Sequence, residues 1–572
     1  MKPTSRILRA AGTVGMTNLL SRILGFLRDM VVAWYFSPIE RDAFFVAFRI
    51  PNTMRRLFGE GAMVISFVPV FTDIVTRDKE ESKRVFRISM SLLTLVLAVV
   101  VILGIVFARY IIMAFAPGFM DDPEKSRLTI ALTKVMWPFL LFVSLVALAQ
   151  GVLNALDHYM APALAQSVHN ISMIIGAVWI ARLFSVPIMG LAVAVLIGGA
   201  AMLALQVPYL TSRGYYPRFE FNFHHPAVRQ ILFLMAPAAF GLLVYQFNML
   251  ASTIFASLLP TGSVSWLFYA QRFTELPLGI FAVAIGTAVL PTLSHHLAAG
   301  DIDGYRKSFV YSLNLVLFLM LPAMFGLMYL SLPIFSALFQ RGEFNYHESL
   351  MSAQALLAYA PALPVIAGAR VTAPAFYARK DTRTPVRLAV WTFLINLAFS
   401  LILMGPGYVF EPIFNYFGWR PAPGLLLDAL SYKWLAHVGL ALATTLSSFY
   451  NFFALLYHLQ KKVGAIDLGA VFKSSMRTAV AGALMLAPVW LLLHLNLANW
   501  ERMGMRWDKL AVLLGGTVVG LLTFTAVAYA LRQDELMELA EALRRRFRRR
   551  EANPPSRDKP PDGGHLPPPP IE

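Results

Sequence analysis

Three charged residues, Arg22, Arg28 and Asp29, interrupt the apolar stretch SRILGFLRDMVVAWYF at residues 21–36. A charge in the middle of a membrane helix costs about 2.5–3.5 kcal/mol on insertion scales, so such residues serve a function or are paired. On a helix, Arg22 and Asp29 share a face, whereas Arg28 points about 100° away from Asp29. The chemistry open to these side chains is anion binding or a buried ion pair.

The next apolar stretch repeats the pattern. Asp42, Arg49 and Arg56 share a helix face, and the flanking positions carry Arg55 and Glu60. One interpretation is structural: Arg49 pairs with Asp42, Arg56 pairs with Glu60, and the remaining arginines extend to the interface. Together, however, the two stretches hold five Arg against three acids. Because an excess of charge cannot face lipid, we expect a hydrated, positively charged cavity.

The basic residues of this cluster are all Arg, whose planar fork binds phosphate through two parallel hydrogen bonds. The cavity therefore suits an anionic, phosphorylated substrate. An internal repeat adds Arg272, because SWLFYAQRFTELPLGIF places it almost where Arg49 falls in the first half. Glu275, three residues later, is close enough to orient Arg272.

The composition is that of an integral membrane protein. The 572 residues are 58% apolar and 14% charged, and the mean hydropathy is +0.62. Windows of about 20 apolar residues predict an all-α integral membrane fold with fourteen transmembrane helices. The chain has 0 Cys, which excludes disulfides, thiolate metal sites and cysteine nucleophiles. The net charge of +17 lies mainly at helix ends, so we do not expect nucleic acid as a partner.

Basic residues favour one side of the predicted helices. The termini and the loops on their side hold roughly 30 of the 49 Lys and Arg residues, including those around Arg77–Arg87 and Arg379–Arg387. We therefore expect both termini in the cytoplasm.

The sequence resembles itself at a long spacing. Residues 66–93 and 288–316 agree in the position of Pro, the helix exit, the polar loop and the re-entry. This repeat predicts two six-helix lobes arranged as parallel repeats, a plan that transporters use to hold substrate between the halves. The expected divisions are an N-lobe at 1–225, a C-lobe at 226–462, two further transmembrane helices at 463–531, and a terminal segment at 532–572.

The terminal segment combines a basic amphipathic helix with a Pro-rich tail that we expect to be disordered. The Arg cluster at 544–550 suits the anionic inner leaflet, although a plain anchor without specific function fits equally well. The aromatic loop at 405–434 fits packing in the membrane interface or gating of the substrate, and its role stays open.

Five signatures in order resemble the MurJ (MviN) lipid II flippases of the multidrug/oligosaccharidyl-lipid/polysaccharide exporter superfamily. They are LLSRILGFLRDMVVA, ERDAFFVAFRIPNTMRRLFGEGA, APGF at 116–119, SVSWLFYAQRFTELP and FYARKDTRTP. The resemblance covers about residues 8–530. It implies a bacterial inner-membrane transporter, not an enzyme, that moves undecaprenyl-pyrophosphate-linked muropeptide (lipid II) to the outer leaflet by alternating access during peptidoglycan synthesis. The cell-wall synthesis machinery is then a candidate partner.

The family's cavity residues can be carried over only where the motifs match. The matching cavity arginines are Arg22, Arg28, Arg55 and Arg272, and the matching acidic and polar positions are Asp29, Asp42, Asn52, Glu60 and Glu275. Gln271 is a departure, because some members carry an acid beside the Arg there.

Other functions leave no signature. The sequence lacks G-x-x-x-x-G-K-[ST] and H-E-x-x-H, so neither P-loop ATP hydrolysis nor that metal site is expected, and we expect no cofactor. A membrane glycosyltransferase would need a carboxylate or metal site at one membrane face, and a multidrug exporter would need a more acidic and aromatic cavity. A transporter of another polyprenyl-pyrophosphate oligosaccharide stays open, as does coupling to Na⁺ or H⁺.

Overall fold

The computed structural model describes residues 3–55, 62–222, 224–409, 435–495, 498–504, 506–541 and 544. Side chains are described in these ranges except at 3–15, 18, 55, 62–65 and 236–249. The secondary structure of this part of the chain is helical and contains no strand. The predicted all-α class is therefore confirmed.

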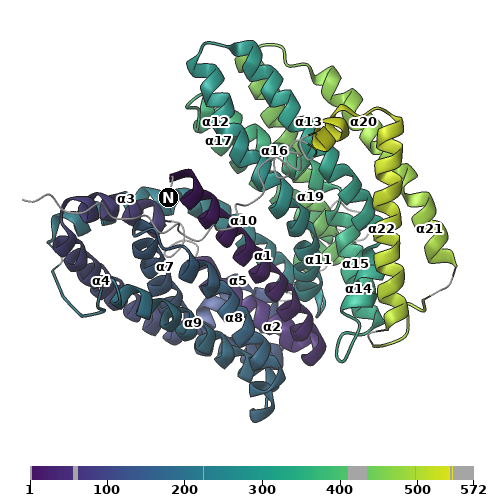
Figure 1. Cartoon of the computed structure of the whole chain (residues 1–572). Helices are drawn as coiled ribbons and strands as arrows, with labels where there is room; N and C mark the ends of the chain where they lie inside the picture. Colours follow the sequence, from purple (N-terminus) through teal and green to yellow (C-terminus); the bar gives the residue numbers. More distant parts are fainter. Residues whose placement is uncertain are drawn as a thin grey trace, which may run out of the picture.

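Figure 1 shows two groups of helices that meet where α2 lies beside α11 and separate towards α3 and α12. The first helix group consists of α1 (Pro3–Tyr35), α2 (Pro38–Arg55), α3 (Ala62–Arg77), α4 (Lys79–Val106), α5 (Ala108–Phe115), α6 (Pro123–Met136), α7 (Phe139–Ala155), α8 (Met160–Val178) and α9 (Pro187–Thr211). The long helix α10 (Pro226–Ser257) follows and packs on α3.

The second helix group consists of α11 (Ser263–Pro277), the π-helical turn η4 (Leu278–Ala282), α12 (Val283–Ala298), α13 (Ile302–Tyr329), α14 (Ser331–Leu338), α15 (Tyr346–Tyr359), α16 (Ala362–Ala378), α17 (Arg383–Met404) and α19 (Ala436–Val463). Against it lie α20 (Leu468–Leu484), α21 (Leu486–His494) and α22 (Trp507–Ala530), with α20 beside α13 and α22 beside α14.

Among the described residues, 9 helical stretches are long and apolar enough to cross a membrane, or 10 if the bent pair α15 and α16 is one span. This finding supports the predicted membrane class. The charged helices α1 and α2 are not among these stretches. The predicted number of fourteen crossings stays a prediction.

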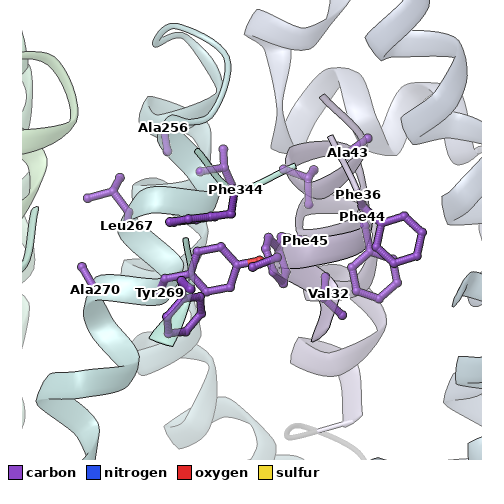
Figure 2. Packing of buried hydrophobic residues seen from close by; sticks show 14 of the residues in the cluster. Val32, Phe36, Ala43, Phe44, Phe45, Ala256, Leu267, Tyr269, Ala270 and Phe344 are labelled. Carbon is purple, nitrogen blue, oxygen red and sulfur yellow. The ribbon is translucent and has the colours of Figure 1, made fainter. Parts of the chain in front are cut away.

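An aromatic contact joins the two helix groups. Phe45 of α2 stacks on Phe268 of α11 with ring centroids 4.1 Å apart, and it meets Tyr269 edge-on at 5.5 Å. Figure 2 shows Phe45 and Val32 facing Tyr269 and other apolar residues across this junction. Aromatic pairs of this kind add about 0.5–1.5 kcal/mol each to the area that they bury. The contact therefore holds the α2–α11 end of the molecule closed.

The APGF signature has a steric role at the same end. A Cβ atom on Gly118 would lie 2.4 Å from the backbone oxygen of Ser257, at the end of α10. Only glycine allows this approach without a shift of the backbone.

Candidate anion-binding site between the helix groups

One carboxylate joins two arginines from different helix groups. Arg28 of α1 donates from Nε and Nη2 to Oδ1 of Asp29, at 3.0 and 2.6 Å. The other carboxylate oxygen, Oδ2, lies 2.9 Å from Nε of Arg272 on α11. The side chains of Arg28 and Asp29 are 8% and 4% exposed, whereas that of Arg272 is 38% exposed. An anion entering between the groups would therefore meet Arg272 before it meets Arg28.

Asn170 of α8 completes this cluster. Its Oδ1 accepts a hydrogen bond from Nη1 of Arg28 at 3.0 Å, and its Nδ2 donates to the backbone oxygen of Ser21 at 3.0 Å. Asn170 is not among the residues predicted from the sequence, although an Asn inside an apolar stretch is a signal of function or pairing. Asn170 and Asp29 engage three of the five N–H groups of Arg28, and Nη1 also contacts Sδ of Met173 at 3.9 Å, which leaves one N–H on Nη2 for an oxyanion.

Arg22 extends to the second helix group instead of pairing with Asp29. Its Nη2 donates to the backbone oxygen of Gly279 at 3.3 Å, inside the π-helical turn η4. Arg28, the neighbouring residue in the chain, takes the place beside Asp29. Arg22 and Asp29, which share a helix face, therefore do not pair in this structure. The expected contact of Arg272 with Glu275 is present at 3.4 Å.

Asp42 is buried at the junction of α2 and α11. Its carboxylate accepts backbone hydrogen bonds from Gly262 and Ser265 at 2.7 and 2.9 Å, and it lies 3.0 Å from Nζ of Lys125 on α6. A carboxylate is stabilised at a helix N-terminus, where the dipole and free N–H groups favour negative charge. Pairing of Asp42 with Arg49 within one helix is therefore wrong. Asp42 ties α11 to the first helix group.

A second buried ion pair lies at this closed end. Nη2 of Arg41 is 2.5 Å from Oε2 of Glu348 on α15, and Nε1 of Trp266 donates to the same oxygen at 3.0 Å. Neither Arg41 nor Glu348 is predicted from the sequence as a paired charge, because each lies at a helix start, where charged residues ordinarily reach water. The tertiary structure alone brings them together.

The remaining expected site residues are only partly described. Arg55 ends α2, and its side chain is outside the described residues, as is all of Glu60. Asn52 is partly buried on α2. Arg49, on the same helix, donates to Oγ1 of Thr253 on α10 at 2.6 Å. Within the described residues, no group of three or more His, Asp or Glu side chains could hold a metal ion.

Comparison with known proteins decides the family. Residues 33–410 match the family described as "Lipid II flippase MurJ". The chain belongs to the MurJ family.

Relatives match most of this MurJ chain. A "Probable lipid II flippase MurJ" from Vibrio cholerae is 33% identical over 92% of this chain and 97% of its own length. The "Lipid II flippase MurJ" of Burkholderia cenocepacia is 34% identical over 72% of this chain and 80% of its own length.

Solved structures agree with this assignment. A structure described as "Lipid II flippase MurJ, inward closed conformation" matches with a TM-score of 0.70 and 26% identity, over 91% of this chain and 99% of the other. An inward-facing multidrug resistance MATE family transporter of the MOP superfamily matches with a TM-score of 0.63. At 14% identity, over 79% of this chain and 96% of the other, that likeness shows a shared fold.

Proposed function

We propose that this protein is a transporter that moves lipid II from the inner to the outer leaflet of the bacterial cytoplasmic membrane and so supplies peptidoglycan synthesis. The observation that carries the proposal is the Arg28–Asp29–Arg272 cluster between two helix groups in a member of the MurJ family. A flippase needs an anion site that both halves share, because relative motion of the halves then moves the site from one face to the other. No catalytic step is part of this proposal.

The topology that we propose has fourteen crossings with both termini in the cytoplasm. Lobes 1–225 and 226–462 are parallel repeats, and 463–531 adds two helices. The charge distribution of the loops supports this orientation, because Lys and Arg gather on the terminal side. The Arg-rich segment at 544–550, outside the described residues apart from Arg544, binds the anionic inner leaflet in this scheme.

Closure of the molecule at its α2–α11 end supports an alternating-access cycle. The Asp42 contacts and the Arg41–Glu348 pair close the α2–α11 end, so the substrate enters from the opposite, cytoplasmic side. The pyrophosphate binds Arg272 and Arg28, and Arg55 contributes from α2. When the pyrophosphate binds the guanidinium groups of Arg28 and Arg272, the ion pair between Asp29 and Arg272 weakens. The closed end then opens and releases the head group outside.

The test replaces Arg28, Arg55 and Arg272 singly by Ala and by Lys, with exposed Arg182→Ala as the matched control. The measurement is the extracytoplasmic accessibility of lipid II in cells depleted of the native protein. We expect loss of export with Ala and only partial rescue with Lys, because Lys lacks the bidentate fork. Full activity of all three Ala variants would contradict the site assignment.

A further inference from the structure

The segment between α9 and α10, residues 212–225, is clamped to α4 through one of its faces. Tyr215 is buried, and its hydroxyl lies 2.8 Å from Oγ of Ser82. Glu220 lies 2.8 Å from Nε of Arg84 and 3.0 Å from Nε of Arg87. The hydrogen bond from Arg84 lowers the pKa of the Glu220 carboxyl, which keeps this group ionised. The segment is therefore held in place on the first helix group.

The opposite face of the segment is aromatic. Tyr216, Phe219 and Phe221 are 53%, 67% and 58% exposed. Phe219 and Phe221 flank Glu220, whose carboxylate is held by Arg84 and Arg87. The two Phe rings are nearly parallel, at 6°, with centroids 6.2 Å apart. A clamped segment thus presents a fixed aromatic surface.

The length of α4 indicates how deep in the membrane this aromatic surface lies. Its 28 residues span about 42 Å, which exceeds the hydrocarbon thickness of about 30 Å by roughly eight residues. The far end is apolar and exposed at Ile102 and Val106, so the excess lies at the Lys79 end. Arg84 and Arg87 then lie at the boundary of the hydrocarbon. The backbone N–H of Glu220 donates to Oγ of Ser91 at 2.8 Å, about one helical turn farther towards the hydrocarbon than Arg87.

We propose that residues 216–221 form a membrane-interface anchor whose partner is the lipid bilayer itself, with Tyr216, Phe219 and Phe221 at the boundary between head groups and acyl chains. Aromatic side chains are at home at this depth, and the adjacent basic residues suit anionic head groups. The anchor fixes the connection between the helix groups at a constant depth beside α4. It does not depend on which substrate the protein moves.

The natural absence of Cys allows a direct test. Phe219→Cys and Phe221→Cys are each labelled with a nitroxide in the full-length protein, reconstituted into vesicles of phosphatidylethanolamine and phosphatidylglycerol. Power saturation measures collision with oxygen, which concentrates in lipid, and with a water-soluble nickel chelate. Ala299→Cys, in the exposed turn between α12 and α13, is the aqueous control. We expect high oxygen and low nickel accessibility at 219 and 221 and the reverse at 299.

Nickel accessibility at 219 and 221 equal to that at 299 would overturn the proposal. Because the vesicles contain no other protein, this result would show that the bilayer does not cover the aromatic surface and would favour a protein partner instead. A second label tests the clamp: at Tyr216→Cys, adding Arg84→Ala and Arg87→Ala should increase nickel accessibility, since the segment then leaves the interface. No change at 216 would show that these ion pairs do not set its depth.

Discussion

At the scale of the residue, a buried carboxylate controls two guanidinium groups. Oδ1 of Asp29 accepts hydrogen bonds from Nε and Nη2 of Arg28, and Oδ2 of Asp29 faces Nε of Arg272. An oxyanion of the substrate offers the same geometry and a higher charge. In the proposed cycle, Asp29 preorganises the site without blocking it, since exchange of one anion for another keeps both guanidinium groups paired throughout.

Asn170→Ala should slow flipping, because Arg28 loses the neutral partner that fixes its orientation. Loss of a hydrogen bond to a charged group costs about 1.5–3 kcal/mol, which corresponds to about a tenfold loss or more. Export of lipid II in depleted cells is the measurement. Ser167→Ala, a buried polar change on the same helix, is the control and should keep normal export. Normal export by the Asn170 variant would show that Asp29 alone orients Arg28.

Asp42→Ala should destabilise the protein, because it leaves Lys125 buried without its carboxylate and removes a cap from α11. Breaking one partner of a buried ion pair costs about 3–5 kcal/mol. A lower midpoint of thermal unfolding in detergent would be the readout. Adding Lys125→Met should recover part of the loss, since the unpaired charge is then gone. An unchanged midpoint in the single variant would argue against this account.

At the scale of the element, a buried ammonium group links the C-terminal helices to the second helix group, in addition to their packing. Lys509 of α22 is fully buried, and its Nζ donates to Ser336 and to the backbone oxygen of Arg502 at 2.9 and 2.6 Å. It also reaches Gln340 and the backbone oxygen of Trp500, both at 3.3 Å. All four partners are neutral oxygens. The lysine thus ties the segment before α22 to α14 and takes no part in the anion site.

Lys509→Met should lower the thermal stability and leave flipping close to normal. The substitution keeps the apolar volume of the side chain but removes the hydrogen-bond donor of the surrounding oxygens. Each buried oxygen left without a donor costs about 1–3 kcal/mol. Thermal unfolding in detergent and lipid II export would be compared in the same variant. A loss of export at an unchanged melting temperature would place α22 inside the transport machinery.

At the scale of the whole molecule, the proposed cycle requires the two helix groups to part at the α2–α11 end to release the head group outside. The stacked rings of Phe45 and Phe268 cross this junction. In the natural Cys-free background, the pair Phe45→Cys and Phe268→Cys should form an oxidative cross-link that arrests export. Reduction should restore export, and each single variant should be insensitive to oxidant. Export that continues while the cross-link is intact would contradict alternating access.

Membrane potential should drive or reset the cycle. Moving one charge through 100 mV is worth about 2.3 kcal/mol, and a head group of charge −2 leaving an inside-negative cell gains about twice that. A flipping assay with and without an uncoupler measures the effect. Export at the same rate after the potential has been dissipated would count against this coupling.

The sequence by itself determined the membrane class, the all-α fold and the family, because apolar length, charge position and local motifs are properties of neighbouring residues. The position of Arg28, Asp29 and Arg272 inside predicted apolar helices also indicated that these charges line a cavity. Only the tertiary structure decided their partners. Arg28 rather than Arg22 pairs with Asp29, Asn170 comes from 142 residues away, and Asp42 caps α11 instead of pairing with Arg49. The physical reason is reach: a helix fixes which residues share a face, but packing between helices decides which distant group is near enough to satisfy a buried charge.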